Sequence, residues 1–138
     1  MAQSFRTTRR VEFRDTDAAG IAHFSAFLFY MESVEHELLR DLGLSVLWAD
    51  ESGPISWPRV SVSCDYSGSA RFEEVLDITL RVARLGTKSV TYEFDFTCGN
   101  RPIARGRTVA VCCRIPQGAS PESIPIPGPI AAKLREFA

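Results

Sequence analysis

The stretch "EFRDTDAAGIAHFSAFLFYMESVEHELLRDLG", Glu12 to Gly43, decides the fold, because an acidic turn with a glycine directly precedes the longest apolar helical pattern of the chain. From about Phe24, apolar residues recur at intervals of three and four positions, which predicts a helix with one apolar face. Ser25 stands where an N-cap is expected, and Gly43 follows the last turn, as in a left-handed C-cap. The predicted apolar stripe consists of Phe24, Phe27, Leu28, Met31, Val34, Leu38 and Leu42.

Strand patterns surround this helix. The segment Phe5–Phe13 is rich in β-formers and predicts a first strand. After a turn-rich connection from Ala49 to Pro58, side chains alternate between apolar and polar in several segments, as in strands with one buried face. We therefore predict an α+β domain in which a curved antiparallel sheet of about five strands covers one long central helix. The later strands are expected at 60–66, 75–85, 89–96 and 103–115, and a short helix at 130–137.

Length and composition narrow the class of protein. The 138 residues fit a single domain, 1–138, and the formal net charge of −1 argues against a nucleic-acid binder. No stretch reaches the roughly 18 apolar residues of a membrane span, and the N-terminus lacks the apolar core of a secretory signal, so we expect a cytoplasmic protein without a membrane partner. The four cysteines form no CxxC pattern and are expected to be reduced thiols, without a metal site.

A single sheet around one helix leaves its edge strands uncovered. Unpaired strand edges and an incompletely buried helix are commonly completed by a second copy of the chain. We therefore expect a homodimer or a homotetramer.

The turn before the helix suggests a reaction. The first turn of a helix carries unpaired N–H groups and a partial positive charge, so it can polarise a carbonyl group. Gly20 leaves room for a ligand, and the N–H groups from His23 to Ala26 are the candidate donors. A nearby aspartate facing the polarised carbon would suit acyl transfer or hydrolysis. The alternative is that Asp15 and Asp17 only cap a polar turn.

The spacing "DTDAAG" (15–20), followed by an aromatic helix, resembles the 4-hydroxybenzoyl-CoA thioesterase branch of the hotdog-fold superfamily, whose members hydrolyse acyl-CoA thioesters. The segment from Val11 to Met31 carries the resemblance, and the element order extends it over nearly the whole chain. It implies a hotdog fold, with Asp17 as the nucleophile or general base and a backbone N–H near Phe24 polarising the thioester carbonyl. Asp15 is expected to be structural. No cofactor is implied, because the CoA thioester is the substrate.

The same resemblance implies a site for CoA. Lys88 and Ser89 match a Lys-Ser pair that contacts the CoA phosphates in some members, and Arg84 would add positive charge. Pro58 falls near the expected acyl pocket. Ser61 and Ser63 are expected to supply polar contacts there.

Other residues and functions stay open at this point. His23 stands where many relatives have Asn, and we expect a neutral His that packs beside the pocket or orients water or substrate. Glu32 and Glu35 are expected on a polar helix flank, although another hotdog branch uses a carboxylate on this helix. Two alternatives to hydrolysis remain: a hotdog hydratase or dehydratase acting on hydroxyacyl thioesters, and a non-catalytic protein that binds acyl thioesters.

Overall fold

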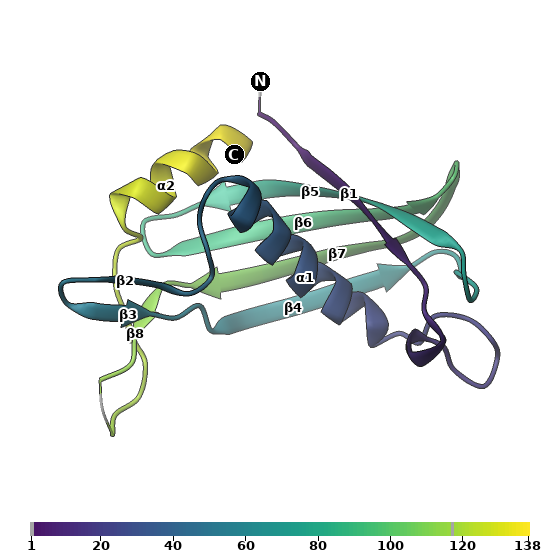
Figure 1. Cartoon of the computed structure of the whole chain (residues 1–138), viewed down its shortest axis with the longest axis horizontal. Helices are drawn as coiled ribbons and strands as arrows, with labels where there is room; N and C mark the ends of the chain where they lie inside the picture. Colours follow the sequence, from purple (N-terminus) through teal and green to yellow (C-terminus); the bar gives the residue numbers. More distant parts are fainter. Residues whose placement is uncertain (1, 117) are drawn as a thin grey trace.

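A five-stranded antiparallel sheet with the strand order β1-β5-β6-β7-β4 curves around the long helix α1 (Ala26–Asp41) (Figure 1). The computed structural model describes residues 2–116 and 118–138. This arrangement confirms the predicted α+β hotdog fold. The strands of the sheet are β1 (Phe5–Arg10), β4 (Arg59–Tyr66), β5 (Val75–Leu85), β6 (Ser89–Cys98) and β7 (Arg101–Val111).

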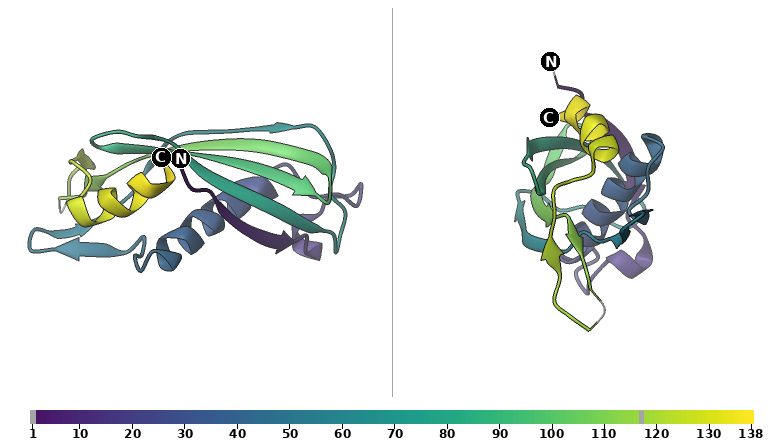
Figure 2. Two further views of the ribbon diagram at one scale, coloured as in Figure 1. Left: turned by 90° about the horizontal axis from the view of Figure 1, so that it is seen from above. Right: turned by 90° about the vertical axis from the view of Figure 1, so that its left-hand side faces the viewer.

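The core lies between α1 and the concave face of the sheet (Figure 2). Tyr92, Phe94 and Phe96 alternate along β6 and are buried on this face, as their period-two spacing predicts. Gly106 of β7 permits the close approach of the helix, because a Cβ atom at this position would overlap the sulfur of Met31. The buried side chains of α1 include Phe27, Met31, Val34, Leu38 and Leu39.

Shorter elements complete the chain. They are the 3-10 helix η1 (Phe13–Asp15), the hairpin β2 (Trp48–Asp50) and β3 (Gly53–Ile55), the pair β8 (Cys113–Arg114) and β9 (Glu122–Ser123), α2 (Gly128–Leu134) and the 3-10 helix η2 (Arg135–Phe137). Helix α2 lies on the same side of the sheet as α1 and buries Ile130 and Leu134 (Figure 2). Among the described residues, no helix is long and apolar enough to cross a membrane.

Three local predictions need correction. The first strand ends at Arg10 rather than Phe13, because Glu12 and Asp15 form a capping box that starts η1. The last long strand is interrupted at Cys112, where the carbonyl accepts the N–H of Ile124 from the C-terminal segment instead of continuing the sheet. Ser25 occupies the N-cap position of α1, but its side chain makes no capping hydrogen bond.

The edge strand β4 lies where it was predicted, but its apolar face is largely uncovered. Val60 is 63% exposed and Val62 is 45% exposed, whereas the alternation of this strand had predicted a buried face. Helix α1 departs from its predicted stripe in the same way, since Phe24 and Leu28 are exposed. An apolar surface therefore runs from the start of α1 to the outer edge of β4.

Candidate active site

The loop before α1 is a tight turn centred on Asp17 and Gly20. The Asp17 N–H donates to the Ile21 carbonyl at 2.9 Å, and the Gly20 N–H donates to the Asp17 carbonyl at 2.9 Å. Gly20 has a φ of +79°, a conformation that residues with a Cβ rarely adopt, and open space surrounds it. The turn thus holds Asp17 in one place and leaves the surface above Gly20 clear of side chains.

Only one of the two carboxylate oxygens of Asp17 accepts a hydrogen bond within the turn. Its Oδ1 accepts the N–H of Ala19 at 2.8 Å. This is the contact of an Asx turn, the structural role that had been the alternative to catalysis. Its Oδ2 has no hydrogen-bond partner within the described part of the chain. One oxygen therefore fixes the side chain while the other stays available to a substrate or a water molecule.

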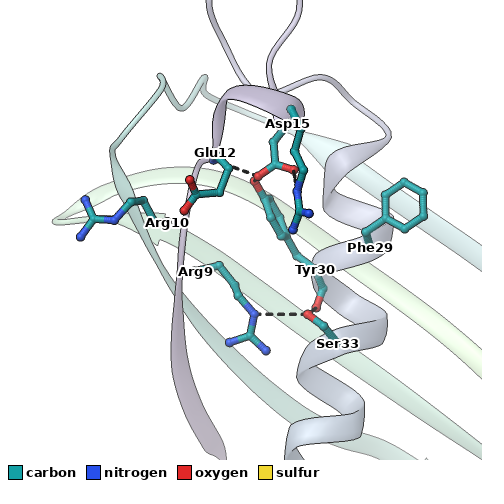
Figure 3. A pocket seen from close by; sticks show the side chains of 8 residues that line it. Arg9, Arg10, Glu12, Asp15, Phe29, Tyr30 and Ser33 are labelled. Carbon is teal, nitrogen blue, oxygen red and sulfur yellow. Dashed lines mark hydrogen bonds and ion pairs between the residues drawn. The ribbon is translucent and has the colours of Figure 1, made fainter.

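Asp15 makes structural contacts, in agreement with its predicted role. Its Oδ2 accepts the N–H of Glu12 at 2.9 Å and the hydroxyl of Tyr30 at 2.9 Å (Figure 3). Burial and the adjacent Asp15 carboxylate raise the pKa of Tyr30, so the phenol stays a proton donor to Asp15. These residues border a cavity of about 610 Å³ between β1 and α1, but Asp17 does not line it.

Hydrogen bonds within the loop occupy three of the four N–H groups at the start of the helix. The His23 N–H donates to the Asp15 carbonyl at 2.7 Å, and the Ala26 N–H donates to the His23 carbonyl at 2.9 Å. The Ser25 N–H donates to Nδ1 of His23 at 3.2 Å. Of these four successive N–H groups, that of Phe24 is left without a partner among the residues that the structure describes. This matches the position predicted for the polarising donor.

The peptide group of Phe24 is held by a residue that sequence reasoning missed. The Tyr66 hydroxyl, at the end of β4, donates to the Phe24 carbonyl oxygen at 2.7 Å. Tyr66, Phe24 and Asp17 together line a cavity of about 210 Å³. Asp17 and Phe24, the residues predicted to carry the reacting carboxylate and the polarising N–H, therefore line one cavity. Tyr66 falls at the end of the predicted strand 60–66, and no local pattern indicates this contact.

The His23 ring packs beside this cavity without any arrangement for a metal. Its centroid lies 4.2 Å from that of Phe24, and Nδ1 lies 2.8 Å from the Ser25 hydroxyl oxygen. Because Nδ1 accepts the Ser25 N–H, the neutral ring carries its proton on Nε2. In the described ranges, no group of three or more His, Cys, Asp or Glu side chains is placed to hold a metal ion.

The residues predicted to bind CoA lie at the opposite end of the sheet. The Lys88 carbonyl accepts the N–H of Cys112, and the Pro58 carbonyl accepts the N–H of Val111. Ser89 pairs with Val111 in the same region, whereas Asp17 lies near the Tyr66 end of β4. Arg84 lies on β5 opposite Thr91, near Ser89. Ser61 and Ser63 point to the convex face of the sheet, away from α1. One chain therefore does not bring these residues to Asp17.

A buried ion pair joins the middle of α1 to the start of β4. Arg59 donates to Oε1 of Glu35 at 2.6 Å, and Glu35 is only 2% exposed. Burial raises the pKa of Glu35 to about 7, while Arg59 acts in the opposite direction. The expectation that Glu35 lies on an ordinary polar flank was wrong, whereas Glu32 is exposed.

Arg59 reaches Glu35 because the register of β4 shifts between Arg59 and Ser61. Arg59 pairs with Ala110, and Val62 pairs with Thr108, two residues of β7 that face α1. An irregularity of this kind turns a side chain to the other face of a strand.

Comparison with known proteins identifies the class. The model of a thioesterase-like superfamily matches residues 11–134. The 1,4-dihydroxy-2-naphthoyl-CoA hydrolase of Thermosynechococcus vestitus is 26% identical over 129 residues, which cover 92% of this chain and 86% of the relative. The acyl-CoA thioester hydrolase YbgC of Escherichia coli is 23% identical, with coverages of 88% and 90%.

Solved structures agree with the fold. A 1,4-dihydroxy-2-naphthoyl-CoA thioesterase from Synechocystis superposes with a TM-score of 0.85 at 23% identity and covers 96% of each chain. A gentisyl-coenzyme A thioesterase superposes with a TM-score of 0.79 at 26% identity, covering 94% of this chain and 99% of the other. The chain belongs to the thioesterase-like superfamily, a hotdog-fold family. The prediction of a thioester-hydrolase enzyme is confirmed at this level.

Proposed function

We propose that this protein hydrolyses an acyl-CoA thioester to the free acid and CoA, with Asp17 as the reacting carboxylate. The observation that carries the proposal is that Asp17 and Phe24 line the same cavity, while the Phe24 N–H has no partner among the described residues. Relatives named as acyl-CoA hydrolases support the reaction class. The proposed chemistry uses only protein groups and water, so it requires no cofactor.

The N–H of Phe24 is proposed to donate to the thioester carbonyl oxygen. Negative charge grows on this oxygen when the carbonyl carbon is attacked, and the positive end of α1 stabilises that charge. This N–H lies in the His23–Phe24 peptide, whose carbonyl accepts the Ala26 N–H at 2.9 Å, and the Tyr66 hydroxyl holds the next peptide through the Phe24 carbonyl. The donor is therefore in place before the substrate arrives.

Asp17 is proposed to act in one of two ways. As a nucleophile, its free Oδ2 attacks the carbonyl carbon, the C–S bond breaks, and the thiolate of CoA leaves; water then hydrolyses the mixed anhydride. As a general base, Asp17 takes a proton from water, the resulting hydroxide attacks the same carbon, and the proton passes to the departing sulfur. Both routes need the free carboxylate oxygen that the turn leaves unpaired.

A dimer formed through β4 would complete the site. Asp17 lies near the Tyr66 end of β4, and the predicted CoA contacts Pro58, Lys88 and Ser89 lie at the Arg59 end. A two-fold axis that pairs β4 with a second β4 runs the two edge strands antiparallel, so one strand's end lies beside the other's beginning. The CoA contacts of one protomer would then serve the Asp17 of its partner, and exposed Val60 and Val62 would lie at the interface.

The decisive experiment measures thiol release from a panel of acyl-CoAs, aryl and aliphatic, with the native protein and with Asp17→Asn. Asparagine keeps an oxygen that can accept the Ala19 N–H, so the turn should survive while the reacting carboxylate is lost. We expect a fall in kcat of about 100-fold or more with an unchanged melting temperature. Equal rates for the two proteins would refute the assignment of Asp17. Turnover of enoyl-CoA by hydration, without hydrolysis, would favour the hydratase instead.

A further inference from the structure

The segment 67–74 joins β4 to β5 and forms part of the wall of the Asp17 cavity. The residues of this segment that line the cavity are Gly68, Ser69 and Ala70. The proposed hydrolysis assigns no role to any of them. What holds this wall in place therefore bears on how Asp17 itself is held.

The segment is also hydrogen-bonded to the loop that carries Asp17. The Ala22 N–H donates to the Ala70 carbonyl at 2.7 Å, and Ile21 forms an isolated antiparallel bridge with Arg71. The Ile21 carbonyl in turn accepts the Asp17 N–H at 2.9 Å. A displacement of the segment would therefore reach Asp17 through only two residues of the loop.

Glu74 closes the turn at the end of this segment. Its Oε1 accepts the Arg71 N–H at 2.7 Å, and its own N–H donates to the Arg71 carbonyl at 3.0 Å. Between the two, Glu73 has a φ of +73°, a conformation that few residues with a Cβ adopt. Such a conformation persists only where the surrounding contacts fix it, so the turn depends on the hydrogen bonds that Glu74 makes.

Arg101, the first residue of β7, holds both ends of the turn. Its Nη2 donates to Oε2 of Glu74 at 2.9 Å, and its Nη1 donates to the Ser69 carbonyl oxygen. The planar guanidinium presents several donors in a fixed arrangement, so one side chain can bind the carboxylate and the carbonyl together. We call these contacts of Arg101 with Ser69 and Glu74 the Arg101 clamp. It ties the wall of the Asp17 cavity to the central sheet.

We propose that Arg101 is a positioning residue for thioester hydrolysis, because its clamp keeps the segment 67–74 against the loop of Asp17. This inference rests on the proposed function and adds a residue that acts without lining the cavity. A misplacement of about 1 Å in a reacting group can cost about 100-fold in rate. Loss of the clamp should therefore lower kcat much more than it raises KM.

The test replaces Arg101 and, as a matched control, a second arginine of the same strand. Arg105 donates to Asp95 at 2.8 Å, and it lies on the convex face because its neighbour Gly106 faces α1. For Arg101→Ala we expect kcat to fall by about 10-fold or more, with KM changed by less than about threefold. Arg105→Ala should retain the native values. A native kcat in Arg101→Ala would overturn the proposal while leaving hydrolysis by Asp17 intact.

Chemical rescue distinguishes positioning from a general loss of stability. The Arg101 side chain is 47% exposed, so a free guanidinium ion can enter the space that Arg101→Ala leaves. Guanidinium chloride, kept well below denaturing concentrations, should raise kcat of this variant at least about threefold and leave Arg105→Ala unaffected. Arg101→Lys keeps the charge without the fork of donors and should have an intermediate kcat. Absence of rescue, with a loss of kcat that matches the loss of folded protein, would overturn the proposal.

Amide hydrogen exchange tests the clamp without relying on catalysis. Peptides that cover 16–25 contain the Ala22 N–H, which is bonded to Ala70. In Arg101→Ala these peptides should exchange faster than in the native protein or in Arg105→Ala, because the segment that accepts their hydrogen bonds has been released. Faster exchange would support the clamp even if the proposed hydrolysis failed. Unchanged exchange would refute it independently of any activity.

Discussion

The Tyr66 hydroxyl donates to the carbonyl oxygen of Phe24 at 2.7 Å, so the end of the edge strand fixes the peptide group at the start of the central helix. The two residues are 42 positions apart in the chain. The contact holds the Phe24–Ser25 peptide, which adjoins the His23–Phe24 peptide whose N–H is proposed to polarise the substrate. We therefore propose that Tyr66 is a positioning residue rather than a reacting one.

Replacing this hydroxyl tests that role. In Tyr66→Phe the ring remains but the Phe24 carbonyl loses its donor, so we expect kcat to fall by about 5- to 20-fold with KM nearly unchanged, equivalent to roughly 1–2 kcal/mol in the transition state. Steady-state kinetics on the best acyl-CoA provides the measurement. A change confined to KM would indicate that Tyr66 contacts the substrate instead.

The ion pair of Glu35 and Arg59 predicts an unusual pH dependence of stability. Because burial raises the pKa of Glu35 above its value in the unfolded chain, the folded state holds this proton more tightly. The contribution is fully present below the unfolded pKa, near 4.5, and is lost as pH rises through about 7. Each pKa unit of difference corresponds to about 1.4 kcal/mol.

Glu35→Gln is the matched comparison, since glutamine has the same shape and does not titrate. We expect the free energy of unfolding of the native protein, relative to that of this variant, to decrease between about pH 4.5 and 7. Urea denaturation across this range measures the difference. A constant difference would mean that Arg59 holds Glu35 ionised throughout.

The exposed valines of β4 test the proposed dimer. Val62→Lys places a charge on the apolar edge, so we expect dissociation to monomers together with loss of most hydrolysis, because in the proposed dimer the CoA contacts come from the partner. Light scattering coupled to size-exclusion chromatography measures the mass. Val75→Lys changes a comparably exposed valine on β5 and should leave the mass unchanged. A native protein that is monomeric and fully active would contradict the arrangement.

Gly106 tests how closely α1 must approach the sheet. A methyl group at this position would overlap the sulfur of Met31, so Gly106→Ala should destabilise the fold by about 1–3 kcal/mol. Gly128→Ala has open space around its new methyl group and should be neutral or slightly stabilising. Thermal unfolding of the two variants distinguishes these effects, and equal melting temperatures would show that Met31 moves aside at little cost.

Much of the fold follows from local periodicity, whereas the site depends on contacts between distant segments. Helix α1 and strands β5 and β6 lie close to their predicted ranges because their apolar spacing matches their geometry. The burial of Glu35 could not be predicted in this way, since it requires Arg59 to leave the regular alternation of β4. A single register shift determines this contact, and no pattern in the amino-acid sequence indicates where the shift occurs.

The selection of the Phe24 N–H was equally beyond local patterns. The turn residues identified four candidate donors, but the choice among them depends on which acceptors lie nearby. The Asp15 carbonyl, the His23 carbonyl and the His23 ring occupy the other three. The family resemblance had already indicated Asp17 and an N–H near Phe24, and the structure adds the physical reason that the other three N–H groups are occupied.

The side of α1 that runs from the residue after Phe24 toward Glu35 is a place where the size of the substrate site can be changed by substitution. Leu28, one turn after Phe24, is 40% exposed, lies outside the core and lines a cavity of about 240 Å³. Its size can therefore be altered without repacking the interior. A graded series of side chains at this one position would act as an adjustable stop, setting how long an acyl group the helix accommodates.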